Sequence, residues 1–144
     1  MRQGAALAVS RRVMLSCAAL WACAALSACA PGTPAPASAG SRGEALFAAN
    51  CSTCHQPDAR GIPRVYPALA GSAIVNGDPG ALARWVVKGE RPATMPAGRY
   101  PTAMPVFGWL KDADAAALLT HLRTHFGNHA GEVQPQEVAR ALGR

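Results

Sequence analysis

The sequence predicts a small all-α domain in which three to five helices are joined by long loops. Apolar residues recur at helical spacing in three separate segments of the chain. No stretch of useful length alternates apolar and polar residues as a half-buried strand would, and no internal repeat is present. The segments between the helical patterns are rich in proline and glycine, which end helices and favour turns.

Residues 1–28 have the pattern of a secretory signal peptide. The first twelve residues carry three arginines, and residues 13–28 carry no charge. This uncharged run is short for a membrane span, which needs about 18 to 20 apolar residues. We therefore expect export to the bacterial periplasm.

The end of this segment allows two kinds of cleavage. Leu26-Ser27-Ala28-Cys29 resembles the bacterial lipobox, which predicts cleavage before a lipidated Cys29 and a membrane tether. Ala28-Cys29-Ala30 also fits the simpler A-x-A pattern, which would give a soluble periplasmic protein. The lipoprotein is favoured because the four-residue match directly follows the apolar run.

Residues 29–41 are interpreted as the lipid anchor followed by a Pro/Ala-rich tether. From residue 30 the segment contains only Ala, Pro, Gly, Ser and Thr, which cannot form a core. Three of the 14 basic residues lie in the predicted signal, so 11 basic residues face 8 acidic ones in the mature chain. The remaining basic residues form no stripe, and this excludes a nucleic-acid partner.

The folded domain is expected over residues 42–130. Its first helix should begin at Ser41 or Arg42 and reach the pair of cysteines at positions 51 and 54. A second helix is predicted to start at Asp78-Pro79, with Asp as the cap and Pro in the first turn. Gly89 should end that helix.

The last helix of this domain should open at Asp112 or Asp114 and close at Gly127-Asn128. Its apolar residues share one arc of about 100°; they are Ala115, Leu118, Leu119, Leu122 and Phe126. Residues 131–144 form a C-terminal tail with a weak amphipathic stretch. That stretch either packs back on the domain or docks on a partner.

Two long loops, residues 61–71 and 90–105, suggest that something other than the helices fills the interior. Loops of this length are unusual in a domain of fewer than about 100 residues unless something organises them. Three short helices also supply only a thin apolar core. A large, flat apolar cofactor would complete it.

Cys51-Ser52-Thr53-Cys54-His55 is a C-x-x-C-H motif, the attachment pattern for c-type haem. Thiols at positions i and i+3 project from one side of a helical turn, where they can add across the two haem vinyl groups. A zinc site would need a second cysteine pair, which the mature chain lacks. A thioredoxin-like dithiol would need a β-α-β surround and does not require the histidine.

Residues 42 to about 140 resemble a class I cytochrome c. Family members begin with a Gly and an aromatic residue that meet the last helix, here Gly43 and Phe47. The resemblance implies that His55 binds the iron and that the carbonyl of Pro67 accepts the second N–H of its ring. Pro63 is the alternative acceptor.

The same resemblance implies a methionine as sixth ligand. Met104, within Met104-Pro105-Val106-Phe107, matches the family's M-P-x-F run before the last helix, whereas Met95-Pro96 is the alternative. Bis-histidine ligation by the histidines at 121, 125 or 129 is the other possibility, but all three are interpreted as surface residues. Phe107 and Trp109 are expected to pack in the haem pocket.

The resemblance therefore implies one covalent haem c with His/Met axial ligation and an electron carrier that is not an enzyme. A thioether favours ferrous iron, and a six-coordinate iron leaves no position for a substrate. The stretch from Met104 to Arg140 further resembles small cytochrome c subunits of bacterial periplasmic alcohol or sugar dehydrogenases. The expected partners are such a dehydrogenase, a terminal oxidase and, through Cys29, the membrane. The alternatives are a haem-based gas sensor, in which Met104 dissociates, and a haem enzyme with an open site.

Overall fold

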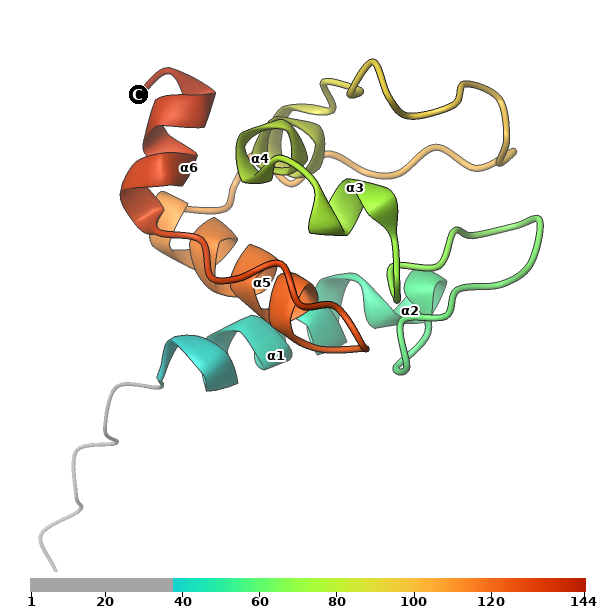
Figure 1. The fold of residues 1–144 in the computed structure, drawn as a ribbon, viewed down its shortest axis with the longest axis horizontal. Coiled ribbons are helices and arrows are strands. Elements are labelled where there is room, and N and C mark those ends of the chain that lie inside the picture. Colours follow the sequence, from blue (N-terminus) through green and yellow to red (C-terminus); the bar gives the residue numbers. More distant parts are fainter. Residues whose placement is uncertain (1–37) are drawn as a thin grey trace, which may run out of the picture. The chain divides into compact units, whose positions relative to one another are not determined.

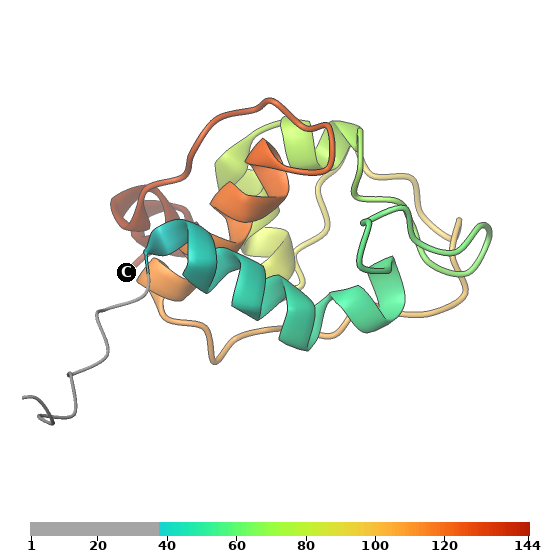
Figure 2. The same cartoon turned by 90° about the horizontal axis from the view of Figure 1, so that it is seen from below.

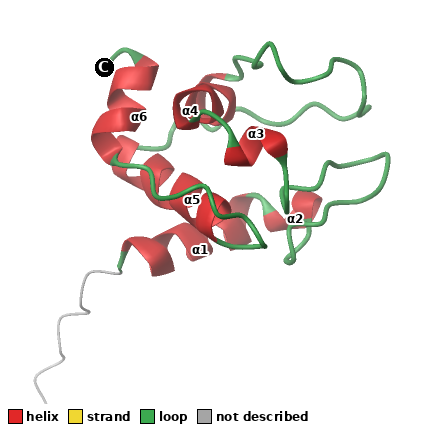
Figure 3. Cartoon of the chain, in the orientation of Figure 1, coloured by secondary structure: helices red, strands yellow, loops and turns green. Residues whose placement is uncertain are grey.

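A computed structural model describes residues 38–144 of the chain. The predicted signal, Cys29 and residues 30–37 of the predicted tether lie outside these residues, whereas residues 39–41 of that tether belong to the first helix. The elements in chain order are α1 (Ala39–Asn50), α2 (Ser52–His55), α3 (Ala73–Asn76), α4 (Pro79–Lys88), α5 (Asp112–Thr124) and α6 (Pro135–Leu142). Residues 38–144 contain no strand, and long loops connect the helices (Figure 3). The all-α prediction is confirmed.

The pair α1 and α5 forms the centre of the fold, and the two helices lie side by side in both views (Figures 1 and 2). The contact is close because Gly43 has no side chain: a Cβ there would overlap the Ala117 carbonyl oxygen. Phe47, which is 3% exposed, fills the next turn of the crossing. The expectation that Gly43 and Phe47 meet the last helix of the domain is confirmed, because Gly43 lies against Ala117 and the Phe47 ring centroid lies 5.7 Å from that of His121.

Helix α1 begins earlier than the sequence indicated. It starts at Ala39, and the side chain of Ser38 accepts a hydrogen bond from the Ser41 N–H. A serine at the N-cap satisfies one of the free N–H groups of the first turn, so the helix extends to the nearest available cap.

Helix α4 has the start and stop that its residues predict. The Asp78 carboxylate accepts from the N–H groups of Gly80 and Ala81, and Pro79 occupies the first turn. Gly89 follows the helix in the left-handed conformation, at φ 72°. Both ends are therefore fixed by local chemistry.

Helix α5 ends at Thr124, earlier than the predicted stop at Gly127-Asn128. The chain leaves the helix at His125, and Phe126 and Gly127 take positive φ values of 57° and 76°. This turn directs the side chain of Asn128 into the core, where it is fully buried. Tertiary hydrogen bonds of Asn128, described below, therefore end the helix before its apolar pattern runs out.

The C-terminal tail packs on the domain. Helix α6 contacts α4 and α5, and Val133, Val138 and Leu142 join the buried core. The N–H of Gln134 donates to the Glu137 carboxylate and Gly143 ends the helix, so α6 is capped at both ends. No helix within residues 38–144 is both long and apolar enough to span a bilayer.

Candidate functional site

The turn that joins α1 to α2 carries the two cysteines and the histidine of the C-x-x-C-H motif. The Cys51 N–H donates to the Phe47 carbonyl at 2.9 Å, and the His55 N–H donates to the Cys51 carbonyl at 2.9 Å. The helical path is thus nearly continuous, and it presents Cys51 and Cys54 one turn apart. Both cysteines are free thiols, with Cys51 buried and Cys54 half-buried. Burial raises the pKa of the Cys51 thiol to about 11, so it is protonated at neutral pH.

His55 is buried, with 7% of its surface exposed. Its Nδ1 lies 2.9 Å from the carbonyl oxygen of Pro67, which can only accept, so Nδ1 carries the proton. Burial lowers the pKa of the imidazole despite that hydrogen bond, which favours the neutral ring. A neutral ring protonated at Nδ1 has its lone pair on Nε2, the atom free to bind a metal. Pro63, the alternative acceptor, is exposed.

The loop between α2 and α3 brings Pro67 back to His55. Gly61, at φ 65°, lies directly against the returning chain, because a Cβ there would sit 2.5 Å from the Pro67 oxygen. The N–H groups of Leu69 and Ala70 both donate to the carbonyl of Ala59, at 2.8 and 3.0 Å. Ala59 is itself fully buried. The loop is therefore held by its own backbone around the Pro67 carbonyl.

The two candidate methionines are both half-buried, on the loop between α4 and α5. Met104 packs against the hydrophobic core, and three residues later the Phe107 N–H donates to the Val86 carbonyl of α4 at 3.0 Å. Phe107 also packs against the core. Trp109 does not, because 60% of its surface is exposed.

The interpretation of His121 as a surface residue is wrong. Its side chain is 5% exposed and packs between Phe47 and Phe126, while its Nδ1 is buried without a hydrogen-bond partner in residues 38–144. Both α1 and α6 contact helix α5, so residues of α5 outside its apolar arc, such as His121, are also buried. His125 and His129 are exposed, as expected.

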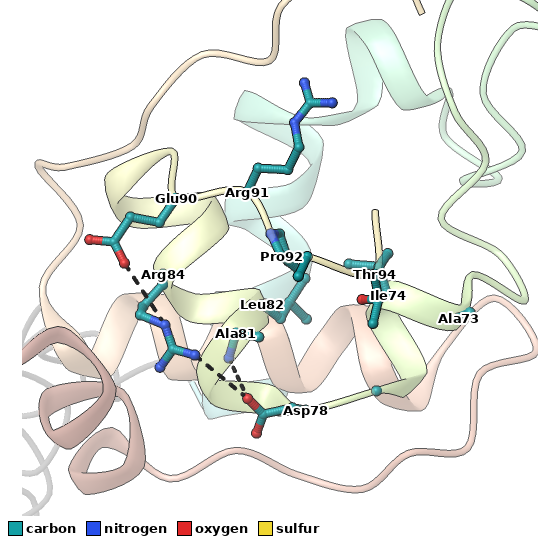
Figure 4. Close-up of a pocket in the computed structure, with 12 residues that line it drawn as sticks. Ala73, Ile74, Asp78, Ala81, Leu82, Arg84, Glu90, Arg91, Pro92 and Thr94 are labelled. Atoms are coloured by element: carbon teal, nitrogen blue, oxygen red, sulfur yellow. Dashed lines mark hydrogen bonds and ion pairs between the residues drawn. The ribbon is translucent and has the colours of Figure 1, made fainter. Parts of the chain in front are cut away.

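A cavity is present elsewhere in the described part of the domain. It has a volume of about 610 Å³ and is bounded by α3, α4 and the start of the following loop (Figure 4). Arg84 sits at its rim between the carboxylates of Asp78 and Glu90, at 3.8 and 3.9 Å. Neither the motif residues nor the two methionines line this cavity.

The donor set fits a c-type haem. Two reduced cysteines one turn apart suit thioether attachment, and a buried neutral imidazole with a free Nε2 suits axial ligation. Sequence reasoning missed one residue connected to this site: Asn128, which was assigned only to the end of a helix. In the sequence Asn128 only follows Gly127 at the end of an apolar helical pattern, which indicates a turn and gives no sign that the asparagine is buried.

Comparisons with known proteins agree with the site. The family model for cytochrome c matches residues 40–126. The cytochrome c subunit of the quinone alcohol dehydrogenase of Gluconobacter oxydans is 32% identical over 106 residues, which cover 70% of this chain and 22% of that subunit. The corresponding subunit of Komagataeibacter europaeus is 29% identical over 103 residues, covering 68% of this chain and 22% of its own. The chain therefore spans about a fifth of the length of these subunits.

A third relative is cytochrome c-552 of Thermus thermophilus, which is 34% identical over 85 residues, covering 56% of this chain and 65% of its own. These relatives share the family whose model matches more than half of this chain. The chain belongs to the cytochrome c family, whose haem c is covalently bound.

Proposed function

We propose that this cytochrome carries one haem attached through Cys51 and Cys54, with His55 and Met104 as the axial ligands, between a periplasmic dehydrogenase and a terminal oxidase. The observation that carries the proposal is the buried His55 imidazole, whose Nδ1 donates to the Pro67 carbonyl. That bond fixes the tautomer, orients the ring and makes Nε2 a stronger donor. The bound haem supplies a one-electron couple between ferric and ferrous iron.

Attachment requires both thiols in the reduced form. Each S–H would add across one vinyl group, forming a carbon–sulfur bond and placing the hydrogen on the other vinyl carbon without consuming an oxidant. Burial raises the pKa of the Cys51 thiol, which lowers the fraction of this thiol present as thiolate at neutral pH. Replacing either cysteine by Ala should leave a single thioether and shift the reduced absorption band to longer wavelength.

Met104 is supported by its contact with the core and by the hydrogen bond that anchors the following residues to α4. A thioether ligand raises the reduction potential and fills the sixth position. Met104→Ala should abolish the weak far-red band that sulfur ligation gives in the ferric spectrum, whereas the matched control Met95→Ala should keep it. The reverse result would assign Met95. Rapid binding of carbon monoxide to the reduced wild type would instead favour the gas-sensor alternative.

The dehydrogenase partner is proposed from the relatives, two of which are cytochrome c subunits of quinone alcohol dehydrogenases. Residues 100–110, which include Met104, carry no charge and expose Val106 and Trp109 by 54% and 60%. An apolar surface next to the proposed iron ligand suits a brief contact that depends little on salt.

Stopped-flow reduction of the ferric protein by a quinone alcohol dehydrogenase and ethanol tests this partner. Trp109→Ala should lower the second-order rate constant several-fold at an unchanged reduction potential. Val65→Ala, at an exposed apolar residue of the other loop, is the control and should leave the rate unchanged. Failure of the wild type to accept electrons at any salt concentration would reject this class of donor.

We further propose that the chain is exported and anchored to a membrane through lipidated Cys29. The support is the basic start, the uncharged run and the Leu26-Ser27-Ala28-Cys29 sequence. Mass spectrometry of the membrane fraction should find a diacylated N-terminal cysteine, and Cys29→Ser should release the protein into the soluble periplasm. An unmodified N-terminus in the wild type would instead support the soluble alternative.

A further inference from the structure

Asn128 is the most completely bonded side chain in the described part of the molecule. It lies after α5 and is 0% exposed. Its Oδ1 accepts from the Gly71 N–H at 2.9 Å and from the Asn76 amide at 2.7 Å. Its Nδ2 donates to the carbonyls of Leu69 and Leu122, at 3.1 and 2.8 Å. Both lone pairs and both hydrogens of the amide are therefore used.

Three of these four hydrogen bonds go to the segment between Pro67 and α4. Their partners in that segment lie 52 to 59 residues before Asn128 in the sequence. Leu69 follows Pro67 by two residues, and its peptide groups are held on both sides. Its N–H donates to Ala59 and its carbonyl accepts from Asn128. The Pro67 carbonyl accepts from His55, and the residues just after Pro67 are hydrogen-bonded to Asn128 in the C-terminal part of the domain.

Burying the Asn128 amide costs free energy, so its presence in the core needs an explanation. Removing an amide from water costs free energy that only a full set of hydrogen bonds offsets, and an apolar side chain would fill the same space without that requirement. The turn that aims Asn128 inward also places the non-glycine residue Phe126 at φ 57°, a conformation unfavourable for L-residues. The hydrogen bonds of Asn128 are therefore formed despite two costs in free energy, the desolvation of its amide and the unfavourable backbone conformation of Phe126.

We propose that Asn128 is a positioning residue for the haem iron, acting through the Leu69–Gly71 segment to hold the Pro67 carbonyl against His55 Nδ1. This inference rests on the ligation by His55 proposed above. A carbonyl held firmly at 2.9 Å polarises the Nδ1–H bond and makes Nε2 more basic, which stabilises ferric iron. Releasing the carbonyl should therefore raise the reduction potential.

Asn128→Leu in the holoprotein tests the proposal, because it removes all four hydrogen bonds at similar volume. We expect the equilibrium constant for reduction to rise by between about threefold and tenfold, the upper limit corresponding to about 59 mV for one electron. The haem-methyl resonances of the ferric protein, which report the orientation of the axial imidazole, should move. The Gly71 N–H should also exchange faster with deuterium.

Thr120→Val is the matched control. Thr120 lies on α5, and its hydroxyl accepts from the Val133 N–H at 2.9 Å and donates to the Val133 carbonyl, so the substitution releases the tail but not the 61–71 loop. It should lower stability and leave the potential and the methyl resonances at their wild-type values. If Asn128→Leu fails to fold, Asn128→Ser, which is too short to reach all four partners, should give a smaller shift of the same sign.

A potential and methyl resonances that stay at wild-type values in a folded Asn128 variant would overturn the inference and leave Asn128 a purely structural residue. Failure of the proposed function is recognised separately, in the wild type. A ferric spectrum that is not low-spin, or retention of histidine ligation after His55→Ala, would reject the ligation without any Asn128 variant.

Discussion

Replacing Gly43 by Ala tests the contact on which the α1–α5 pair depends. The new methyl group would overlap the Ala117 carbonyl oxygen and lie 2.8 Å from the His121 Cβ. Carbon atoms in contact prefer about 3.5 to 4.0 Å, so the helices would have to separate by roughly 1 Å. Neither obstacle can rotate away, because one is backbone and the other is a Cβ atom.

The magnitude follows from two opposing effects. Overpacking of a tight site costs about 1 to 3 kcal/mol, and sites that cannot relax lie at the upper end. Ala in place of Gly within a helix returns about 1 kcal/mol. We therefore expect Gly43→Ala to lower the free energy of unfolding by about 2 kcal/mol.

Urea denaturation of the ferric holoprotein, followed by far-ultraviolet circular dichroism, measures this difference. Gly40→Ala is the matched control on the same helix, since the nearest heavy atom to a Cβ there is the Ser38 Oγ at 4.0 Å. That variant should be as stable as the wild type or more stable by up to about 1 kcal/mol. If Gly43→Ala were as stable as Gly40→Ala, the close approach of the two helices would not need glycine at position 43 and the reasoning would be refuted.

Three further variants probe the loop, a cap and a buried titratable group. Gly61→Ala should push the Pro67 carbonyl away from its position and raise the reduction potential, measured by redox titration; an unchanged value would contradict this. Asp78→Ala should remove the cap of α4 and cost about 0.5 to 2 kcal/mol in urea denaturation, and a smaller loss would mean that water replaces it. Burial and the nearby His125 lower the pKa of His121 in the folded protein below its ordinary value of 6.5. As the pH falls below 6.5, the unfolded chain therefore binds a proton at this residue before the folded protein does, and the free energy of unfolding decreases until the pH passes the lower folded pKa. His121→Leu should therefore flatten the decline in unfolding free energy between about pH 8 and pH 5, and an unaltered slope would assign that decline to other groups.

Local signals in the sequence predict the parts of the fold that local chemistry decides. Asp78-Pro79 and Gly89 bracket α4 because a carboxylate cap and a left-handed glycine act within one turn of the helix end. The end of α5 is different. Its apolar pattern continues to Phe126, but the helix stops at Thr124, where the chain turns to bring Asn128 to partners more than 50 residues away. No pattern within the helix contains that information.

Burial at α5 could not be predicted from one apolar arc either. The arc identifies the face toward the main core, but α6 covers a second face, and the sequence left open whether the tail would pack there. His121 falls between these contacts and is buried against Phe47 and Phe126.

The candidate site also contains both residues placed by the local sequence and residues placed by contacts distant in sequence. The C-x-x-C-H motif is a local pattern, and a single helical turn places its three functional side chains. The Pro67 carbonyl, by contrast, reaches His55 only because Gly61 allows close approach and Asn128 holds the returning chain from the far side. Residues that set the stability of the helix pair and residues that set the hydrogen bond to His55 are therefore largely different. Substitutions at Gly43 should change the unfolding free energy with little effect on potential, whereas those at Asn128 should change both.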